Sequence, residues 1–540
     1  MLLPERLGDK TGPQERKYGS RYGQRPRPWA LLVRHERLAP LMATASPSSE
    51  IASSPDTSAD APDASADAKV PLHIKLTFGF GVVAYGIKDN GFAVFLLFYY
   101  NQVIGLDALL VSLALAIALC IDAFIDPLIG QLSDHTRTRF GKRHPWLYAS
   151  ALPIAIMWLL LWNPPEMSDG LTFLYLVVIA TLVRFSLSAY EVPSLAMIPE
   201  LTPDYHERTV VLRYRFIFGW AAGLMMLAMA YGYFLQATPE YENGLLNPDG
   251  YPGFAFFGAV IMVIAVLVSA IGTHRRIVGA YHRQGVVHAP AEGLQEMLGA
   301  FSFRPFLLLM LAGVFAFTIQ GLIFALTNYL FTHVWELTED QFLIYPLILF
   351  CGVLLAFLVV TPISKRLEKT GGASLFTFIS LVLGTAPYWL RYFELFPANG
   401  SPMMLPLLFT LVATSTGMGI AAMILTMSMM ADVTDAYEES SGKRTEGLFS
   451  AGMFFMQKMV GGLGILLSGL IISGVGLPEG AKPGTVDPAI VSNLTLIFAL
   501  LITCLGIAGG FAYRLIPISH ADHLARLRAK ARGQREAESG

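Results

Sequence analysis

Long apolar runs alternate with short polar segments along most of this chain. From residue 74 onward each run holds roughly 20 residues, enough for a helix to cross about 30 Å of hydrocarbon. The pattern therefore predicts an all-α membrane protein with twelve spanning helices, which are expected at 74–100, 108–133, 146–163, 171–197, 214–236, 252–273, 305–332, 341–362, 373–391, 404–430, 448–475 and 490–516.

The polar segments between the runs alternate in charge. Every second segment is basic and carries residues such as Arg137, Arg139, Lys142, Arg143, Arg208, Arg213, Arg275, Arg276, Lys365, Arg366, Lys369, Lys443 and Arg444. The intervening segments are acidic and carry Glu166, Asp169, Glu240, Glu242, Glu336 and Asp340. Because Lys and Arg are retained on the cytoplasmic side, this alternation predicts that both chain termini are cytoplasmic.

One longer polar segment divides the runs into six and six. We expect a central cytoplasmic loop at 274–304, an N-terminal six-helix half at 71–273 and a C-terminal half at 305–516. Two halves enclosing a cavity are the layout of many secondary transporters. Residues 517–540 are expected to form a cytoplasmic tail.

Residues 1–70 differ from the rest of the chain. They are basic at first and then rich in Ala, Ser, Asp and Pro, and they contain no apolar segment of the kind found in a signal peptide. Such a composition buries too little apolar surface to fold, so we expect a disordered tail. Met42 is an alternative start of the protein.

The composition narrows the class of protein. Hydrophobic residues make up 54% of the chain and charged residues only 14%, against about 25% charged residues in soluble domains. The chain contains no HExxH, P-loop or GxSxG motif, so neither an enzyme nor a resident metal or cofactor is predicted. Cys120, Cys351 and Cys504 lie in apolar runs and are interpreted as buried hydrophobic residues without disulfides.

Seven charged residues lie inside the apolar runs: Lys88, Asp89, Asp122, Asp126, Arg184, Glu191 and Lys458. A charge in mid-membrane costs at least about 2.5–3.5 kcal/mol, so such residues are functional candidates. Three are positive and four are negative, which leaves a net charge of −1. The sequence thus predicts that a bound cation or proton completes the set.

Asp122 and Asp126 are one helical turn apart and share a face of their helix. Two carboxylates this close in a low dielectric either share a proton or hold a cation between them. Their oxygen atoms suit a hard ion such as Na⁺ or Li⁺, or a proton. The alternative is a structural ion-pair cluster with Lys88 or Lys458.

Asp89 and Glu191 are candidate acceptors for the hydroxyl groups of a sugar. Lys88 is expected to point about 100° away from Asp89 around the helix and to serve another partner. Arg184 lies two turns before Glu191, and we expect it to be the counter-ion of that carboxylate. A packing role is expected for the uncharged polar residues Tyr85, Gln320, Asn328, Tyr329 and Gln457.

Two polar segments are candidate gates. Asp134 and Arg139 lie in "SDHTRTRFGKRHPW" (133–146), and Asp432, Asp435 and Arg444 lie in "DVTDAYEESSGKRTEG" (432–447). Ion pairs in these segments can exchange as two halves move. The alternative is that the charges only fix the topology.

Several motifs together resemble the glycoside-pentoside-hexuronide:cation symporters, a family of the major facilitator superfamily. The resemblance covers about residues 73–516, and it rests on "FGFGVVAYGIKDN", "IDAFIDPLIGQLSDHTRTRFGKRHPWL", "SAYEVPSLAMIPELTPDYHER", "RFIFG", "MADVTDAYEESSGKRTEG" and "MFFMQK". It implies a twelve-helix major facilitator fold.

The resemblance also implies roles for individual residues. It assigns the cation site to Asp122, Asp126 and the hydroxyl of Ser188, with Lys458 close by. It assigns sugar binding to Asp89 and Glu191, and it places Arg215 near the same pocket. We group Lys88 with these substrate-binding candidates.

Four positions depart from the melibiose-type pattern. Glu191 stands where Asp is usual, Leu195 where a Trp stacks on the sugar, Phe454 where a hydroxyl is usual, and Ile125 where a polar residue lies between the acids. These departures favour another glycoside, a uronide or a more apolar solute. They leave Na⁺ and H⁺ open as the coupling ion.

We therefore expect a monomeric carrier in the bacterial inner membrane that moves a sugar or glycoside-like solute together with Na⁺ or H⁺ by alternating access. The alternatives are an exporter or H⁺ antiporter on the same fold, a lysolipid-type carrier, and a membrane sensor that transports nothing.

Overall fold

The computed structural model describes residues 69–284, 302–441 and 446–517 of the chain. Within these residues, twelve helical segments are long and apolar enough to cross a membrane. Their regular structure is helical, and only Thr138 and Gly141 pair as an isolated β-bridge. The prediction of an all-α protein with twelve spans is confirmed.

The N-terminal half begins with a span built from five short pieces. These are α1 (Leu72–Phe80), α2 (Val83–Asn90), the π-helix η1 (Gly91–Phe95), α3 (Leu96–Phe98) and the π-helix η2 (Tyr99–Val103). The next elements are α4 (Ala108–His135), α5 (His144–Leu161), α6 (Asp169–Ala196), α7 (Ile198–Leu201), α8 (Tyr205–Met229), η3 (Ala230–Phe234), η4 (Gly244–Leu246) and α9 (Gly250–Gln284).

The C-terminal half repeats the six-span plan. Its elements are α11 (Arg304–Tyr329), η5 (Leu330–Val334), α12 (Glu339–Arg366), α13 (Lys369–Tyr392), α14 (Met404–Ser441), α15 (Glu446–Val475) and α16 (Pro488–Arg514). Local sequence fixes several of the starts. Asp107 caps α4 by accepting the backbone N–H groups of Leu109 and Leu110, and Thr338 forms a capping box with Gln341 at the start of α12.

Three helices extend nine or more residues beyond the boundaries that the apolar runs predict. Helix α8 begins at Tyr205 instead of residue 214, α9 continues to Gln284, and α14 continues to Ser441. The added turns carry charged residues, so hydropathy marks where a helix leaves the hydrocarbon and not where it ends. Residues 274–284 of the expected central loop are therefore helical. Most of that loop, the chain termini and Arg444 lie outside the described residues.

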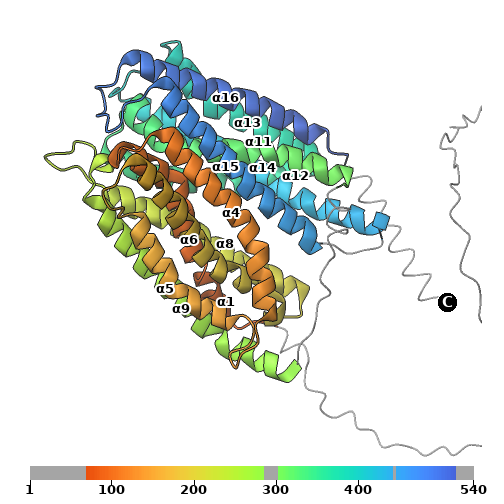
Figure 1. Cartoon of the computed structure of the whole chain (residues 1–540). Coiled ribbons are helices and arrows are strands. Elements are labelled where there is room, and N and C mark those ends of the chain that lie inside the picture. The colour runs from red at the N-terminus through yellow and green to blue at the C-terminus, as the bar shows by residue number, and fades with distance from the viewer. Residues whose placement is uncertain (1–68, 285–301, 442–445, 518–540) are drawn as a thin grey trace, which may run out of the picture. The chain divides into compact units, whose positions relative to one another are not determined.

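Three contacts between spans join the halves: η1 and α3 of the first span pack against α11, α4 packs against α15, and α8 packs against α12. The last two pairs carry the second and eleventh and the fifth and eighth spans, so a shift of six spans converts one pair into the other. This relationship is the arrangement expected of two structural repeats. Figure 1 shows α4 and α15 side by side where the two groups of helices meet.

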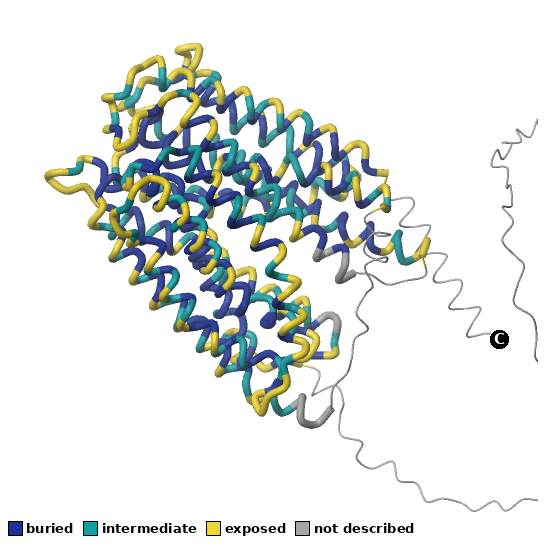
Figure 2. Tube along the Cα trace, viewed as in Figure 1, coloured by how far each residue is buried: buried dark blue, intermediate teal, exposed yellow. Residues whose placement is uncertain are grey.

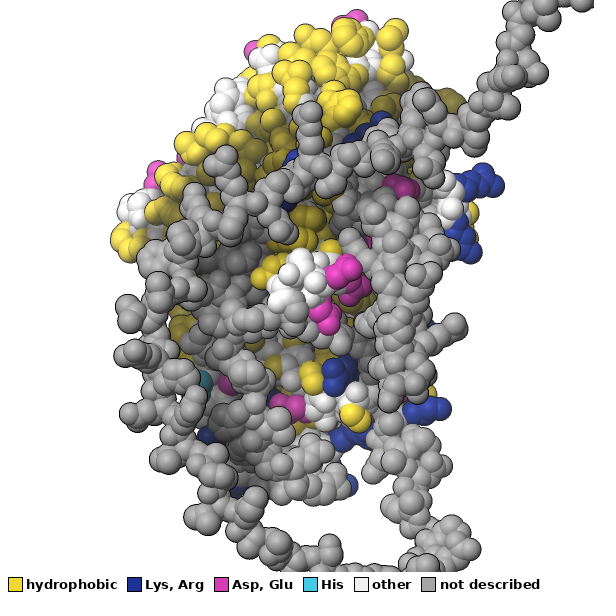
Figure 3. Space-filling view, turned by 90° about the vertical axis from the view of Figure 1, so that its right-hand side faces the viewer, with side chains coloured by type: hydrophobic (Ala, Val, Ile, Leu, Met, Phe, Trp, Pro, Cys, Tyr) yellow, Lys and Arg dark blue, Asp and Glu magenta, His cyan; other side chains and the backbone are white. Residues whose placement is uncertain are grey.

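The structure has one end with acidic connections and one with basic connections. The acidic end carries Asp169, Glu336 and Asp340, and the basic end carries Arg137, Arg143 and Arg208. Figure 3 looks onto the basic end. It shows basic side chains (Lys and Arg) and acidic side chains (Asp and Glu) together on this face. Which end faces the cytoplasm stays a prediction of the positive-inside rule.

The apolar core is continuous across both halves only toward the acidic end. One cluster of buried residues joins the N-terminal half to residues such as Tyr329, Phe331 and Phe498 of the C-terminal half. A second cluster, with Phe306, Phe376 and Phe449 among others, fills the C-terminal half near the basic end. The buried positions follow the helix faces that look inward (Figure 2). The halves therefore share a core at one end of the molecule and have separate cores at the other.

Hydrogen bonds between uncharged groups also join the halves at the acidic end. The hydroxyl of Tyr329 donates to Asn101 Oδ1 at 3.0 Å, and the amide of Asn328 donates to the carbonyl of Val94 at 2.9 Å. The amide of Gln102 donates to the carbonyl of Pro478 at 3.2 Å and accepts from the N–H of Ala481 at 3.2 Å. We call these contacts the acidic-end latch.

Glycines let α15 approach α11 closely within the C-terminal half. A Cβ atom at Gly464 would lie 2.5 Å from the carbonyl oxygen of Thr318, and one at Gly321 would lie 2.7 Å from that of Gly461. Small residues at such crossings bring helix backbones together in membranes. Helix α15 is thus anchored in its own half while its opposite face meets α4.

Candidate functional site

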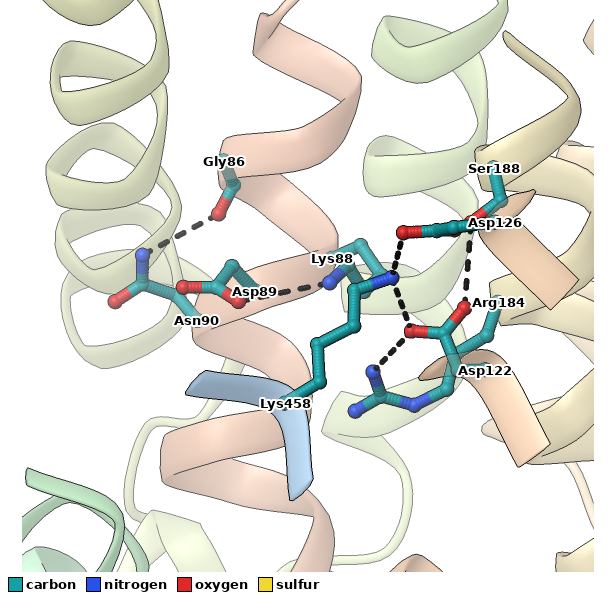
Figure 4. A network of polar contacts seen from close by, with 9 residues as sticks. All are labelled: Gly86, Lys88, Asp89, Asn90, Asp122, Asp126, Arg184, Ser188 and Lys458. Carbon is teal, nitrogen blue, oxygen red and sulfur yellow. Dashed lines mark hydrogen bonds and ion pairs between the residues drawn. The ribbon is translucent and has the colours of Figure 1, made fainter. Parts of the chain in front are cut away.

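The two acids of α4 lie together in the middle of the structure, as their spacing predicts (Figure 4). The Ser188 hydroxyl of α6 lies 2.7 Å from Asp126 Oδ1 and 3.2 Å from Asp122 Oδ1. The resemblance placed Ser188 beside the acid pair, and the structure places it there. Asp122 is almost completely buried, with 4% of its side chain exposed, whereas 30% of Asp126 is exposed.

Lys458 reaches the acid pair from the other half of the protein. Its ammonium nitrogen lies 2.5 Å from Asp126 Oδ2 and 2.9 Å from Asp122 Oδ2. The position between the acids, which the sequence assigned to a bound cation, is therefore filled by a lysine. Pairing with Lys458 was the structural alternative, and the structure shows that pairing.

Arg184 pairs with Asp122, not with Glu191 as its position on α6 suggested. Its Nη1 atom lies 3.2 Å from Asp122 Oδ2, and only 6% of the side chain is exposed. Its guanidinium carbon also lies 4.6 Å from the centre of the Phe92 ring, an arrangement typical of a cation–π contact. The expectation was wrong because Asp122 of the neighbouring helix is nearer than the next turns of α6.

Lys88 and Asp89 form an ion pair, which corrects a second expectation. The two charged groups lie 3.5 Å apart, and the ammonium of Lys88 lies 4.3 Å from the centre of the Tyr85 ring. Neighbouring residues of a regular helix diverge, but here the π-helix η1 begins two residues after Asp89, and the Lys88 side chain is long enough to turn back. Lys88 is buried, whereas 54% of the Asp89 side chain is exposed.

Glu191 pairs with Arg215 of α8. Arg215 Nη2 lies 2.6 Å from Glu191 Oε1, and Nη1 donates to the hydroxyl of Ser194 at 2.7 Å. The second carboxylate oxygen, Glu191 Oε2, is buried and has no hydrogen-bond partner among the described residues. Burying an acceptor without a donor is costly, so this oxygen is a natural place for a hydroxyl group of a solute.

The charges of this region balance. Lys88, Arg184, Arg215 and Lys458 face Asp89, Asp122, Asp126 and Glu191, so four positive charges meet four negative ones. The predicted net charge of −1 was wrong because Arg215 stands next to the expected start of the fifth span at 214 and was not counted among the buried charges. It lies well inside α8, is buried, and pairs with Glu191 at 2.6 Å.

Two of the candidate gate residues, Asp134 and Asp432, form ion pairs within their own halves. Arg143 pairs with Asp134, donates to Ser133 at 2.8 Å and lies 3.5 Å from Glu200. Burial raises the pKa of Glu200, and the charge of Arg143 acts in the opposite direction.

The other gate candidates complete this picture. Lys369 pairs with Asp432 at 2.6 Å, the guanidinium of Arg139 lies over the ring of Phe140, and Asp435 is exposed. A gating role for these residues stays a prediction.

Several functional contacts had little signal in the sequence. Phe92 beneath Arg184 and Ser194 beside Arg215 look like ordinary helix residues until the neighbouring helix is known. The acidic-end latch had a weak signal, the dipeptide Asn101-Gln102 at the end of an apolar run. Asn328 and Tyr329 pack across the halves, in agreement with the packing role expected for them. Cys120, Cys351 and Cys504 are free thiols, but the prediction that they are buried was wrong: Cys351 and Cys504 are exposed and Cys120 is partly exposed, because an apolar run does not distinguish lipid-facing positions from core positions.

Known proteins are similar to this chain in sequence and in fold. Residues 77–520 match the family described as "MFS/sugar transport protein". "Uncharacterized symporter sll1374" of Synechocystis is 26% identical, over 76% of this chain and 86% of its own length. The inner membrane symporter YicJ of Escherichia coli is 23% identical, over 79% of this chain and 88% of its own length. The isoprimeverose transporter of Lactiplantibacillus pentosus is 23% identical, over 75% of this chain and 81% of its own length.

The fold is also similar to solved transporter structures. The crystal structure of a D-xylose-proton symporter superimposes with a TM-score of 0.58 at 15% identity, over 83% of this chain and 98% of that one. The crystal structure of the nucleoside transporter NupG gives a TM-score of 0.54 at 16% identity, over 82% of this chain and 98% of that one. This chain is a multi-pass membrane protein and a transporter, not an enzyme. It belongs to the family described as MFS/sugar transport protein.

Proposed function

We propose that this protein is a secondary active transporter that moves a sugar or glycoside together with a cation by alternating access. The observation that carries the proposal is the contact of Lys458 from one half with Asp122 and Asp126 from the other, in the middle of the membrane-spanning region. A balanced cluster of charges at the boundary between two repeats is an expected place for solute and ion to act on each other.

The polar groups next to this cluster suit a sugar. Asp89 offers an exposed carboxylate, and Glu191 Oε2 is a buried acceptor without a donor among the described residues. Hydrogen bonds from hydroxyl groups to a carboxylate are stronger than those between neutral groups. Arg215 and Ser194 hold the Glu191 side chain in place, so the acceptor is oriented before the solute arrives.

The two ends of the molecule support an alternating-access cycle. The halves share an apolar core and the acidic-end latch at one end, while their cores are separate at the other. This arrangement corresponds to a carrier that is closed at the acidic end. Opening requires the latch to break and the halves to close at the basic end, around a solute held between them.

The experiment is uptake into proteoliposomes that contain the purified full-length chain. Isoprimeverose, lactose and a glucuronide are offered, because relatives carry these solutes in their names. Uptake is measured with an inward Na⁺ gradient, with an inward proton gradient and with neither.

We expect one of the solutes to accumulate against its gradient when one of the ion gradients is present. The Asp122→Cys variant should lose accumulation. If it still concentrates solute, the acid pair has no part in ion coupling. The absence of ion-dependent uptake for every solute, with an intact folded protein, would point to a sensor or to a carrier for another class of solute.

A further inference from the structure

Arg184 places a permanent positive charge at the acid pair. A guanidinium remains protonated at any physiological pH, and this one lies 3.2 Å from Asp122 Oδ2 with its side chain almost completely buried. The proposed transport function needs an ion at this pair, so the charge that Arg184 adds bears directly on which ion can bind.

The two carboxylates carry two negative charges, and Arg184 and Lys458 supply two positive charges within 3.2 Å of them. A further monovalent cation would make the group net positive in a low-dielectric environment. Like charges a few ångström apart repel strongly there, since the interaction energy varies inversely with dielectric constant and distance.

The oxygen atoms of the pair are also occupied. Asp122 Oδ2 contacts Arg184 and Lys458, and Asp126 Oδ2 contacts Lys458. Ser188 lies within hydrogen-bonding distance of Oδ1 of both acids. Na⁺ and Li⁺ bind through several oxygen ligands at once, whereas here both Oδ2 atoms are bound by cationic donors and the two Oδ1 atoms share the single hydroxyl proton of Ser188.

The charged and titratable groups around the pair do not change this balance. Helix α2 contributes Lys88 and Asp89, which neutralise each other, together with the Tyr85 hydroxyl. Helix α6 contributes Glu191, which is neutralised by Arg215 of α8. The acids therefore have no surplus negative charge to attract a metal cation.

A proton adds the same charge as Na⁺, but it forms an O–H bond with a single oxygen and needs no coordination shell, so the occupied oxygens do not exclude it. Asp126 is the accessible acid of the pair, and it interacts with Lys458, whose side chain is 20% exposed, but not with Arg184 in the described contacts. Protonation of Asp126 removes one of the two carboxylate contacts through which Lys458 joins the halves and leaves only the contact with Asp122.

We propose that Arg184 is a built-in cation that closes the acid pair to Na⁺ and Li⁺, so that a proton is the ion that this site couples to solute. Arg184 is thus a residue that determines ion specificity. The proposal rests on the transport function proposed above for its meaning, but its central claim concerns ion binding and can be tested without a solute.

The experiment measures equilibrium binding of radioactive sodium to the purified full-length protein in detergent, with choline chloride as the ionic-strength control. We expect no saturable Na⁺ binding by the wild type. The Arg184→Gln variant removes one positive charge and should gain binding of about one Na⁺ per chain, since one carboxylate then has no counter-ion. The matched control Arg184→Lys keeps the charge and should bind no Na⁺.

Saturable Na⁺ binding by the wild type would overturn the proposal, and so would a folded Arg184→Gln variant that binds none. If Arg184→Gln does not fold, Lys458→Gln gives the same charge change from the opposite side of the pair and should also gain Na⁺ binding; its failure to do so would count against the proposal. Failure of the transport function appears separately, as an absence of solute uptake under either ion gradient.

Discussion

Lys458 and Asp126 lie 332 positions apart in the sequence, yet their charged atoms are 2.5 Å apart. This ion pair joins α15 of the C-terminal half to α4 of the N-terminal half. Because Asp126 is the more exposed acid and Asp122 is bound by Arg184 as well, the two acids have different surroundings despite their regular spacing.

Replacement of the two acids should have unequal effects on stability. Asp122→Asn leaves the buried Arg184 without its carboxylate, and breaking a buried ion pair in this way costs roughly 3–5 kcal/mol. Asp126→Asn should cost clearly less, because Lys458 retains Asp122. Thermal unfolding in detergent measures both. The double variant Asp122→Asn/Arg184→Gln is the control and should recover part of the loss; equal melting temperatures for the two single variants would contradict the prediction.

Glu191→Gln should weaken solute binding and should also destabilise the fold, because it leaves the buried guanidinium of Arg215 without its carboxylate. The change keeps the shape of the side chain, but it removes the charge that pairs with Arg215 and that would accept a solute hydroxyl at Oε2. A hydrogen bond to a charged group contributes about 1.5–3 kcal/mol, which corresponds to a loss of affinity of about tenfold or more.

The measurement is the solute concentration at half-maximal uptake. Ser194→Ala serves as the control, because it removes a contact of Arg215 without changing Glu191, and its effect should be smaller. An unchanged half-maximal concentration in Glu191→Gln would exclude this carboxylate from solute binding.

Locking the acidic-end latch should stop transport. Gln102 contacts Pro478 and Ala481 of the opposite half, so cysteines at 102 and 481 should be joined by a short bifunctional reagent. The three native thiols are free and must first be replaced by serine. We expect cross-linking to abolish uptake and cleavage of a reducible linker to restore it. Full activity of the cross-linked protein would show that the acidic end does not open during transport.

Acidification at the acidic end should favour closure of that end. Burial raises the pKa of Glu479, and the charges of Asp107 and then Asp169 raise it further. Glu479 belongs to the C-terminal half, whereas Asp107 and Asp169 belong to the N-terminal half, so their repulsion is relieved when the halves separate. A carboxyl whose pKa is higher in the closed state binds its proton more tightly there, and a fall in pH toward that pKa stabilises the closed state.

The rate of cross-linking between cysteines at 102 and 481, measured at about pH 5 and about pH 8, checks this prediction. To keep the chemistry comparable, the reagent must react at the same rate with a model thiol under both conditions. The rate should be higher at the lower pH in the parent protein. Glu479→Gln should give a fast rate at both values. A variant that keeps the full pH dependence would assign it to another group.

The sequence predicted the fold well because the membrane imposes one strong rule, that a spanning segment must be long and apolar. The acid pair was recognisable for the same reason, since Asp122 and Asp126 stand out in an apolar run. The partners of the charges were less predictable. Arg184 and Lys88 were given wrong partners because helix periodicity describes the faces of a single regular helix. Asp122, the partner of Arg184, lies on a neighbouring helix. Next to Lys88 and Asp89 the π-helix η1 begins, so the backbone there departs from regular α-helical geometry.

The acidic-end latch is built from amides, a hydroxyl and carbonyls, whereas the contact in the middle of the protein is built from full charges. Salt screens interactions between exposed charges, screens buried ion pairs much less and leaves hydrogen bonds between neutral groups nearly unchanged. The latch therefore sets a threshold for opening that dissolved salt hardly shifts. The carboxylates around Glu479 and the ion held at the acid pair decide when that threshold is reached.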